Sequence, residues 1–430
     1  MQTNFNLAQR AQPEILTSEK VIRTCVHCGF CLATCPTYML LGDELDSPRG
    51  RIYQIKEMLE SPDAPSAETV KHVDRCLSCL ACMTTCPSGV NYMSLIDQAR
   101  AYIESHHVRT WHDRWIRSFL AFVLPKRNVF RLLLRFSPLG APFARFLPSR
   151  LKAMVSMAPA QLPKRDASET PQVFEANGER RGRVALLIGC AQPVLAPQIN
   201  ASTIRYFNRI GFDVVVSKGV GCCGALPHHL GKVDQSRAMA KANIQAWLEA
   251  DAEHALDAII VAASGCGTTL KDYGDMFAND EEWAERARKI ATLAKDVTEV
   301  LALYLGEGEF RKSPKDLVVA YQSACSLQHG QKITEEPLRL LQDAGFRVVE
   351  PKEKHICCGS AGTYNILQPE IAEQLRDRKV AALEATGADV IATGNLGCMA
   401  QVASASSIPV VHTIELLDWA AGGPAPKTLQ

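Results

Sequence analysis

Two matching runs of cysteines carry the strongest chemical signal in the sequence. Residues 25–36 and 76–87 both read C-x2-C-x2-C-x3-C-P, and the second run follows the first at an offset of 51 residues. This spacing is typical of proteins with two [4Fe–4S] clusters, in which the fourth cysteine of each run binds the other cluster. The pattern predicts one cluster on Cys25, Cys28, Cys31 and Cys86, and a second on Cys76, Cys79, Cys82 and Cys35.

Structural zinc sites are the main alternative for these runs, because they also use C-x2-C pairs. Zinc needs only two such pairs, so the third cysteine and the trailing Cys-Pro of both runs would be unexplained. His27 lies inside the first run and could serve as a ligand. Because four cysteines already complete each cluster, we expect His27 to adjust the hydrogen bonding of a nearby sulfur instead.

Eight more cysteines form two C…CCG…C arrangements in the second half of the chain. The offsets between the copies are 135 residues for the first cysteine, 135 for the Cys-Cys pair and 132 for the last cysteine. A repeat that also preserves the order of strands and helices indicates two homologous lobes. The first lobe has the quartet Cys190, Cys222, Cys223 and Cys266, and the second has Cys325, Cys357, Cys358 and Cys398.

Each quartet is expected at one rim of an α/β sheet, because ligands of open sheets bind beyond the carboxyl ends of the strands. There the thiols could hold an additional iron–sulfur cluster or a metal. The alternative is inert, buried cysteine, which is common for single cysteines but explains a repeated set poorly. Four nearby histidines are expected to form hydrogen bonds or lie at the surface rather than act as ligands: His228, His229, His355 and His412.

The elements that would position these cysteines differ along the chain. The N-terminal part reads as helical, with a helix after Ser47 and another over residues 92–103. The first of these helices should bury one face, made of Ile52, Ile55, Met58 and Leu59. From residue 183 onwards, buried strands alternate with helices. Strands are expected at 184–189, 211–216, 257–265, 317–322, 345–350 and 388–395, and helices at 199–210, 235–248 and 371–383.

Residues 109–165 are basic and aromatic, with twelve Lys and Arg residues and a single acid, Asp113. Helical spacing places Arg114 and Arg117 off a face that holds five other residues: Trp111, Trp115, Ser118, Phe119 and Phe122. Such a helix can lie in a membrane interface, or it can pack on the N-terminal domain or a partner subunit with its basic residues in solvent. Five prolines at 138–163 argue against one continuous helix, and residues 159–181 read as a polar linker.

The whole chain sets further bounds on function. It has 430 residues, a net charge of +1 and 16 cysteines. The near-neutral charge gives no reason to expect a nucleic-acid partner. The N-terminus lacks the pattern of a secretory signal and no apolar run approaches a membrane span. We therefore expect a cytoplasmic protein that could bind a membrane surface and whose cysteines serve metal or redox chemistry. No G-x-G-x-x-G follows a predicted strand, so a flavin or nicotinamide is expected on another chain.

The predicted fold class is multidomain, with a mostly helical two-cluster ferredoxin domain followed by two homologous α/β lobes. We predict a ferredoxin domain at 1–107, a basic aromatic segment at 108–181, and lobes at 182–308 and 309–430.

Taken together, these motifs resemble the family of iron–sulfur subunits of bacterial glycolate oxidase, and the match includes CCGALPHHLG from Cys222 and CCGSAGTYN from Cys357. Iron–sulfur subunits of anaerobic glycerol-3-phosphate dehydrogenase and of lactate-oxidising complexes are similar, and heterodisulfide reductases share the CCG repeat. The resemblance implies an electron-transfer subunit with two [4Fe–4S] clusters, cytoplasmic and peripheral at the inner membrane. Its partner subunits would carry FAD, oxidise glycolate to glyoxylate or D-lactate to pyruvate, and supply electrons for a quinone.

One departure from the CCG pattern matters. The fullest repeat ends in C-x-x-C, whereas Ala263 and Asn395 stand three residues before Cys266 and Cys398. Each lobe therefore has four thiols rather than five, which argues against the double-cluster chemistry of heterodisulfide reductases. A subunit of anaerobic glycerol-3-phosphate or lactate dehydrogenase, a thiol or disulfide reductase subunit, and an assembly scaffold are the alternative functions.

Overall fold

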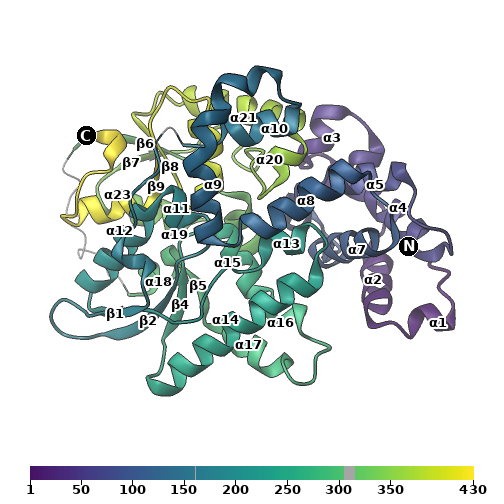
Figure 1. Ribbon diagram of the computed structural model, residues 1–430, viewed down its shortest axis with the longest axis horizontal. Coiled ribbons are helices and arrows are strands. Elements are labelled where there is room, and N and C mark those ends of the chain that lie inside the picture. Colours follow the sequence, from purple (N-terminus) through teal and green to yellow (C-terminus); the bar gives the residue numbers. More distant parts are fainter. Residues whose placement is uncertain (160, 305–314) are drawn as a thin grey trace.

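The computed structural model describes residues 1–159, 161–304 and 315–430. A helical N-terminal part and two α/β lobes are arranged side by side, and the helices α8 and α9 lie across the front of the molecule (Figure 1). This arrangement confirms the predicted fold class. The predicted boundary between the lobes, at residues 308 and 309, lies outside the described residues.

The N-terminal part is built from short helices around one apolar core. Ser47 caps α4, because its hydroxyl accepts a hydrogen bond from the Gly50 N–H at 2.9 Å, and Pro48 occupies the first turn. The predicted face of α4 is buried, and its Ile55 packs with Leu95 of α7 in the core. The elements are α1 (Leu7–Arg10), α2 (Pro13–Thr24), η1 (Phe30–Leu32), α3 (Pro36–Leu41), η2 (Glu44–Asp46), α4 (Pro48–Glu60), α5 (Ala67–Asp74), α6 (Ala81–Thr85) and α7 (Tyr92–His106).

Lobe 1 contains a five-stranded sheet in the order β1-β3-β2-β4-β5. All neighbours are parallel except β1 and β3. The strands are β1 (Gln172–Phe174), β2 (Gly182–Leu187), β3 (Phe212–Val216), β4 (Ala258–Val261) and β5 (Ala294–Asp296). The helices are α11 (Gln192–Leu195), α12 (Pro197–Arg209), α13 (Ala225–His229), α14 (Val233–Glu253), α15 (Ser264–Lys271), α16 (Tyr273–Met276), α17 (Ala284–Leu293) and α18 (Val297–Tyr304).

The strand β1 lies within the stretch that the sequence indicated to be a polar linker. It adds an antiparallel edge strand, with Gln172 paired to Val216. Three residues are too few to show a periodic pattern, so this strand could not be predicted from the sequence. The stretch is therefore partly structured rather than a simple linker.

Lobe 2 repeats the central topology with four parallel strands in the order β7-β6-β8-β9. This order corresponds to β3-β2-β4-β5 of lobe 1, so the repeat seen in the cysteines is also a repeat of the fold. The strands are β6 (Val318–Tyr321), β7 (Arg347–Val349), β8 (Val390–Thr393) and β9 (Val410–His412). The helical elements are η5 (Ser326–Gln331), α19 (Glu336–Asp343), α20 (Tyr364–Leu367), α21 (Pro369–Glu384), α22 (Leu396–Ala403), α23 (Thr413–Ala420) and η6 (Lys427–Leu429).

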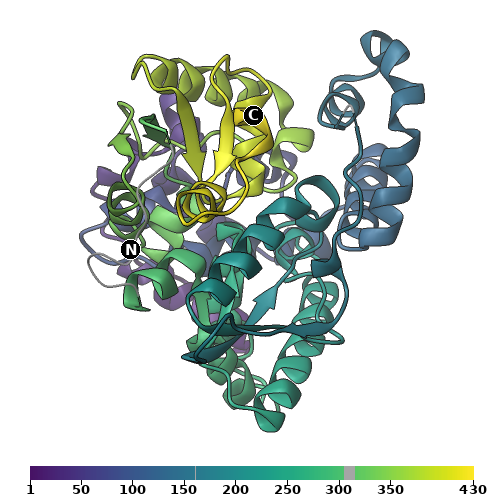
Figure 2. The same ribbon diagram turned by 90° about the vertical axis from the view of Figure 1, so that its left-hand side faces the viewer.

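The two lobes share a core and lie against each other (Figure 2). Phe207 and Leu301 of lobe 1 belong to the same buried cluster as Leu340 and Leu417 of lobe 2. The buried Asp418 of lobe 2 accepts hydrogen bonds from Arg205 at 2.6 Å and from Arg209 at 3.1 Å. The lobes therefore hold their two quartets in a fixed relation.

The basic aromatic segment forms α8 (Trp111–Val123), α9 (Arg127–Gly140), η3 (Ala141–Phe146) and α10 (Ser149–Ser156). The helix α8 packs through Ile116 and Leu120, which share a cluster with Leu230 of lobe 1 and Ile366 of lobe 2. Trp111, Trp115 and Phe122 of this helix are exposed instead, whereas Phe119 packs against the buried cluster. In the described part of the chain, no helix is both long and apolar enough to cross a membrane.

The basic side chains of this segment are not all in solvent. In this respect the structure differs from the predicted alternative, in which the helix packs on the N-terminal domain or a partner subunit with its basic residues in solvent. Arg117 is buried, and it lies 2.8 Å from Asp74 and 3.0 Å from Asp113. Arg109 lies 2.6 Å from the same Asp74. These ion pairs fasten α8 to α5, so part of the positive charge in this segment is structural.

Candidate iron–sulfur sites

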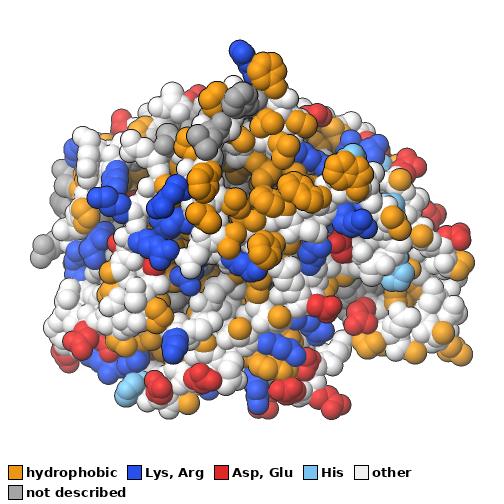
Figure 3. All heavy atoms as spheres, viewed as in Figure 1, with side chains coloured by type: hydrophobic (Ala, Val, Ile, Leu, Met, Phe, Trp, Pro, Cys, Tyr) orange, Lys and Arg blue, Asp and Glu red, His pale blue; other side chains and the backbone are white. Residues whose placement is uncertain are grey.

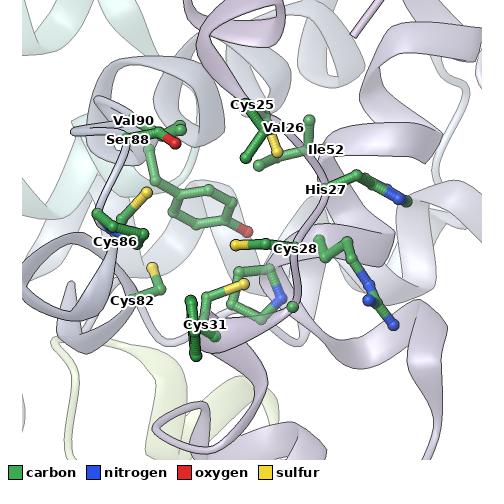
Figure 4. A pocket seen from close by; sticks show the side chains of 16 residues that line it. Cys25, Val26, His27, Cys28, Cys31, Ile52, Cys82, Cys86, Ser88 and Val90 are labelled. Carbon is green, nitrogen blue, oxygen red and sulfur yellow. The ribbon is translucent and has the colours of Figure 1, made fainter.

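The first ligand run surrounds a hollow near the surface, here called the outer hollow. It has about 440 Å³ of empty space, open to solvent on one side, and its lining includes Cys25, Cys28, Cys31, Cys82 and Cys86. Figure 4 shows these thiols pointing toward a common space, whereas His27 points away from it. The structure thus brings together the four cysteines that the sequence assigned to the first cluster.

The second ligand run surrounds a neighbouring inner hollow of about 310 Å³. Its lining includes Cys35, Cys76, Cys79 and Cys82, the four cysteines that the sequence assigned to the second cluster. Cys82 borders both hollows, so the two sites are adjacent. Protein cores are normally filled to crystal-like density, and these sulfur-lined hollows suit a group the size of a cubane cluster. The ligand assignment itself stays a prediction.

The two runs share an unusual backbone at matching positions. His27 and Gly29 have φ of 61° and 87°, and Ser78 and Leu80, 51 residues further on, have φ of 51° and 62°. A left-handed residue next to right-handed ones turns successive N–H groups to one side, where they can bind an anion. Three of these residues carry a side chain and are strained in this conformation, and such strain clusters at functional sites.

Buried thiols without metal are held as neutral groups. Burial raises the pKa of Cys31 to about 11, and it also raises the pKa of Cys82. Metal coordination removes the thiol proton outright. The donor set of both hollows therefore fits iron, which would supply the positive charge that buried thiolates need.

A buried ion-pair network supports the inner hollow. The Arg51 guanidinium is 1% exposed and donates to Asp46 at 3.1 Å and to Thr37 at 3.1 Å, and its Nη1 lies 3.9 Å from Cys35 Sγ. Burial lowers the pKa of Arg51, but the nearby Cys76, Tyr92 and Cys35 more than offset this, so the pKa is raised and the charge is kept.

Other polar groups also reach the inner hollow. Arg100 donates to the Cys76 carbonyl at 2.6 Å and to the Ser78 hydroxyl at 2.6 Å. The Tyr92 hydroxyl donates to Cys76 Sγ at 3.8 Å. Hydrogen bonds and charges near the sulfurs are the main means by which a protein sets a cluster's potential.

The two hollows differ in exposure. Cys28 of the outer hollow is exposed, and the adjoining Val26 and Phe30 are 68% and 64% exposed. Cys35, Cys76 and Cys79 of the inner hollow are buried. The outer site thus faces the surroundings, and the inner site faces the lobes.

In both lobes the structure brings the four predicted thiols together at the carboxyl ends of the strands. In lobe 1, the neighbouring Cys190 and Cys223 lower the pKa of Cys222, whereas Cys222 and Cys266 raise the pKa of Cys223. In lobe 2, the neighbouring Cys357 and Cys398 lower the pKa of Cys358. Cys325 Sγ completes the second set, 3.7 Å from Cys357 Sγ.

The inner hollow lies against the quartet of lobe 2. Leu77, Cys79 and Ala81 share one apolar cluster with Ile356 and Cys357, and Cys325 packs against it. Burial raises the pKa of Cys79, and the next largest cause is the neighbouring Cys325.

Three of the four histidines near the quartets have side-chain contacts with other protein groups, and the fourth, His355, has a backbone contact. His228 and His229 lie 3.3 and 3.4 Å from the buried Asp97 of α7. His412 is buried and caps α23, because its Nδ1 accepts from the Ile414 N–H at 3.2 Å. His355 contributes its carbonyl, which lies 3.2 Å from Nε2 of His329.

Sequence reasoning missed several residues of these sites. Arg51 and Asp46 lie in the insert between the ligand runs, and Lys379 is a buried lysine on α21. A lysine or arginine in a helix is usually exposed, so its type alone carries no signal. For Arg51, its position between the apolar residues of α4 was the one feature of the sequence that could have indicated burial.

Comparisons with known proteins agree with this architecture. The 4Fe-4S dicluster domain matches residues 21–90, and the cysteine-rich domain matches residues 184–271 and 319–403. The fold and sites therefore define an iron–sulfur protein with one dicluster domain and two cysteine-rich domains.

Full-length relatives narrow this class. The chain is 42% identical over 420 residues to the glycolate oxidase iron–sulfur subunit of Escherichia coli (strain K12), covering 98% of this chain and 99% of that one. It is 33% identical over 430 residues to the probable glycolate oxidase iron–sulfur subunit of Bacillus subtilis (strain 168), covering 94% and 95%. The chain belongs to the family of glycolate oxidase iron–sulfur subunits.

Two more distant similarities are informative. Lactate utilization protein A 2 of Bacillus cereus (strain AH820) is 29% identical over 242 residues, which cover 55% of this chain and 97% of that protein. A crystal structure of a hypothetical protein from Helicobacter pylori superposes with a TM-score of 0.55 at 11% identity, covering 97% of this chain and 74% of that one. The second similarity concerns the fold alone.

Proposed function

We propose that this chain is the electron-transfer subunit of a flavin-dependent dehydrogenase complex that oxidises glycolate, and also D-lactate. Partner subunits with FAD take the hydride from the substrate, and this chain carries the electrons one at a time to a quinone. Two [4Fe–4S] clusters, on the eight cysteines of the ligand runs, are the carriers. Membership in the glycolate oxidase family supports the complex, and a dicluster domain supports the carriers.

The observation that carries this proposal is the arrangement of the two thiol-lined hollows. They adjoin at Cys82, the outer one is exposed at Cys28, and the inner one faces the lobes. Adjacent clusters with one exposed end suit a relay. Electrons from the flavoprotein would reach the outer cluster across the exposed Val26 and Phe30.

The test is anaerobic purification of the chain with and without its flavoprotein partner. About eight iron atoms per chain in the ligand runs and two cubane signals by electron paramagnetic resonance (EPR) are expected. Glycolate should reduce these signals only when the flavoprotein is present. Cys28→Ser should impair electron transfer to quinone, whereas Ser88→Ala, in the lining of the same hollow, should not. Full-rate quinone reduction by the flavoprotein alone would refute the relay.

Lactate oxidation is a second candidate for the natural reaction. The similarity to lactate utilization protein A 2 over 55% of the chain supports it. The rates of cluster reduction by glycolate and by D-lactate, measured on the same complex, decide between the two.

We also propose that the aromatic face of α8 contacts the membrane that holds the quinone. Trp111, Trp115 and Phe122 are 70%, 55% and 53% exposed, and Figure 3 shows hydrophobic and basic side chains gathered on this face of the molecule. Lys126 lies 3.5 Å from the centroid of the Phe122 ring, so positive charge adjoins the apolar surface. Exposed aromatic residues beside Lys and Arg suit a lipid interface.

Vesicle co-sedimentation tests this contact. The chain should bind vesicles with anionic phosphatidylglycerol more strongly than neutral phosphatidylcholine vesicles, and serine at all three aromatic positions should abolish binding. A control variant with serine at three other exposed apolar positions, Leu7, Leu16 and Val173, should bind like the parent chain. Equal loss in both variants would contradict the proposal.

A further inference from the structure

The two cysteine quartets are related by the repeat, yet only one of them adjoins the ferredoxin part through its thiols. Cys325 packs against the apolar cluster that contains Cys79, a predicted ligand of the inner cluster. The elements that follow these cysteines are also joined, because Thr84 Oγ1 of α6 lies 2.8 Å from His329 Nδ1 of η5. The hydroxyl of Tyr364 donates to the Arg75 carbonyl at 3.0 Å. The inner hollow and the lobe-2 quartet therefore belong to one packed unit.

The lobe-1 quartet has a different environment. Cys223 and Cys266 pack in the core of their own lobe, with Trp247 and Tyr273. Within the described part of the chain, the polar contacts between lobe 1 and α7 are made by His228, His229 and Lys232 of the segment that follows the CCG loop. These contacts join the surfaces without involving the lobe-1 thiols.

The lobes also differ in a buried charge at equivalent positions. The glycines of the two CCG motifs, Gly224 and Gly359, approach equivalent helix residues, Ser236 of α14 and Ala372 of α21. Seven residues further along these helices lie Asn243 and Lys379, and both are buried. Asn243 donates to the Cys222 carbonyl at 2.9 Å and accepts from the Gly221 N–H at 2.8 Å. Asn243 thus contacts the loop that carries the CCG motif of lobe 1. Lys379 contacts the segment that leads to the CCG motif of lobe 2.

Lys379 places a positive charge where lobe 1 has a neutral amide. Its Nζ donates to the carbonyls of Glu353 at 3.0 Å and Lys354 at 3.3 Å, in the segment that leads to Cys357 and Cys358. Burial lowers the pKa of Lys379, and the four thiols of lobe 2 favour its charged form. In lobe 1, burial lowers the pKa of Arg127, and the nearby Glu169 and Cys190 favour its charged form. A cation near a thiolate site favours the state with more negative charge.

We propose that the lobe-2 quartet, on Cys325, Cys357, Cys358 and Cys398, is the redox site that exchanges electrons directly with the inner cluster, and that Lys379 raises its reduction potential above that of the lobe-1 site. This inference rests on the proposed function, because it requires an inner cluster. One electron leaves the reduced inner cluster and reduces an iron–sulfur centre on the lobe-2 thiols. No bond is broken and no proton is needed, since Lys379 offsets the added negative charge. Lys379 acts only through its positive charge and does not bind the iron of the lobe-2 centre.

The first test uses the matched pair Cys325→Ser and Cys190→Ser, which alters the same position of the two quartets. The reconstituted, full-length chain is reduced stepwise, and EPR records the line shape and power saturation of the inner-cluster signal. The adjacent outer cluster should broaden this signal in every variant. A lobe-2 centre should add further broadening in the parent chain and in Cys190→Ser, and only this added broadening should be lost in Cys325→Ser. Equal behaviour of the two variants would overturn the proposal.

The second test keeps every thiol. Lys379→Gln should shift the midpoint potential of the lobe-2 centre to more negative values while both cubane signals stay in place. The control Lys354→Gln, at an exposed lysine paired with Glu350, should leave all potentials unchanged. An unchanged lobe-2 potential in Lys379→Gln, or iron analysis that finds no metal on the lobe-2 thiols, would overturn the proposal.

These outcomes differ from a failure of the proposed function. If the parent chain shows two cubane signals that glycolate reduces through the flavoprotein, the relay function stands whatever the quartet variants do. If no cubane signal forms in the parent chain, the proposed function fails first and the lobe-2 assignment falls with it.

Discussion

Replacing Arg51 with methionine should lower the reduction potential of the inner cluster without removing any ligand. The guanidinium is buried, and its Nη1 lies 3.9 Å from Cys35 Sγ. Methionine keeps much of the side-chain volume and removes the charge. An electron added to the inner cluster then loses a nearby positive charge that stabilises it.

The size of the effect follows from the geometry. With a separation of roughly 6 to 8 Å between the guanidinium and the centre of the added charge, and an effective dielectric constant of about 20, the lost interaction is about 2 to 3 kcal/mol. For a one-electron couple this corresponds to a shift of about 90 to 130 mV to more negative potential. The outer cluster should shift less, because its predicted ligands lie further from Arg51.

The substitution also costs stability. Breaking a buried ion pair typically costs about 3 to 5 kcal/mol. Asp46 keeps Arg75 at 2.7 Å and His72 at 3.0 Å, so the carboxylate is still compensated and we expect the lower end of this range. The purified variant should therefore fold, with a lower midpoint of thermal unfolding.

The assay is an anaerobic redox titration followed by EPR, on the parent chain, Arg51→Met and Arg51→Lys. Lysine retains the charge, so its potential should stay close to that of the parent chain while its stability falls. An Arg51→Met chain that folds, retains both clusters and has an unchanged inner-cluster potential would refute the electrostatic reasoning.

Three further predictions concern other parts of the chain. Burial lowers the pKa of His412 from about 6.5 in the unfolded chain to about 4 in the folded chain. As the pH falls the unfolded state therefore binds a proton first, so the folded state keeps its full stability above about pH 6.5 and loses stability between pH 6.5 and pH 4. Urea unfolding at pH 7.5 and 4.5 should therefore show the parent chain losing about 2 to 3 kcal/mol more than His412→Gln over this interval. His27→Gly should relieve the left-handed strain at φ 61° and stabilise the chain by about 1 kcal/mol, with unchanged iron content, and loss of iron would instead make His27 a ligand. Arg117→Met should destabilise the chain by about 2 to 4 kcal/mol in thermal or urea unfolding, because the buried carboxylates of Asp74 and Asp113 then lose one of their cationic partners. As a control, Arg114→Met at an exposed position should change stability by less than about 0.5 kcal/mol.

The predicted cysteine sets could be assigned from the sequence because their ligand spacing is local. Residues two apart in a tight turn are held together by the chain itself, so Cys25, Cys28 and Cys31 meet whatever the rest of the protein does. The exchange of the fourth cysteine was inferred from the ligand pattern of two-cluster ferredoxins and stays a prediction. The repeat of the lobes followed from comparing two copies of one pattern. Long buried strands such as β2 and β4 were also visible, because strands covered on both faces read as continuous apolar runs.

The orientation of α8 shows where this reasoning fails. Sequence periodicity found the aromatic face correctly, but periodicity does not say which face is buried. The aliphatic face of Ile116 and Leu120 packs on the lobes, and Arg117 is buried because Asp74, more than 40 positions earlier in the chain, neutralises it. When a charged residue is buried because of a partner far away in the sequence, the local sequence pattern does not predict that burial.

By itself, the sequence determined the kind of chemistry: two ferredoxin ligand runs, two repeated cysteine quartets and the family to which they belong. The tertiary structure alone decided how these sites relate to one another. It brought Cys79 against Cys325, buried Arg51 beside Cys35, and buried Lys379 against the segment that leads to Cys357. The physical reason is that ligand geometry depends on neighbours along the chain, whereas charge and proximity between sites depend on packing between distant segments.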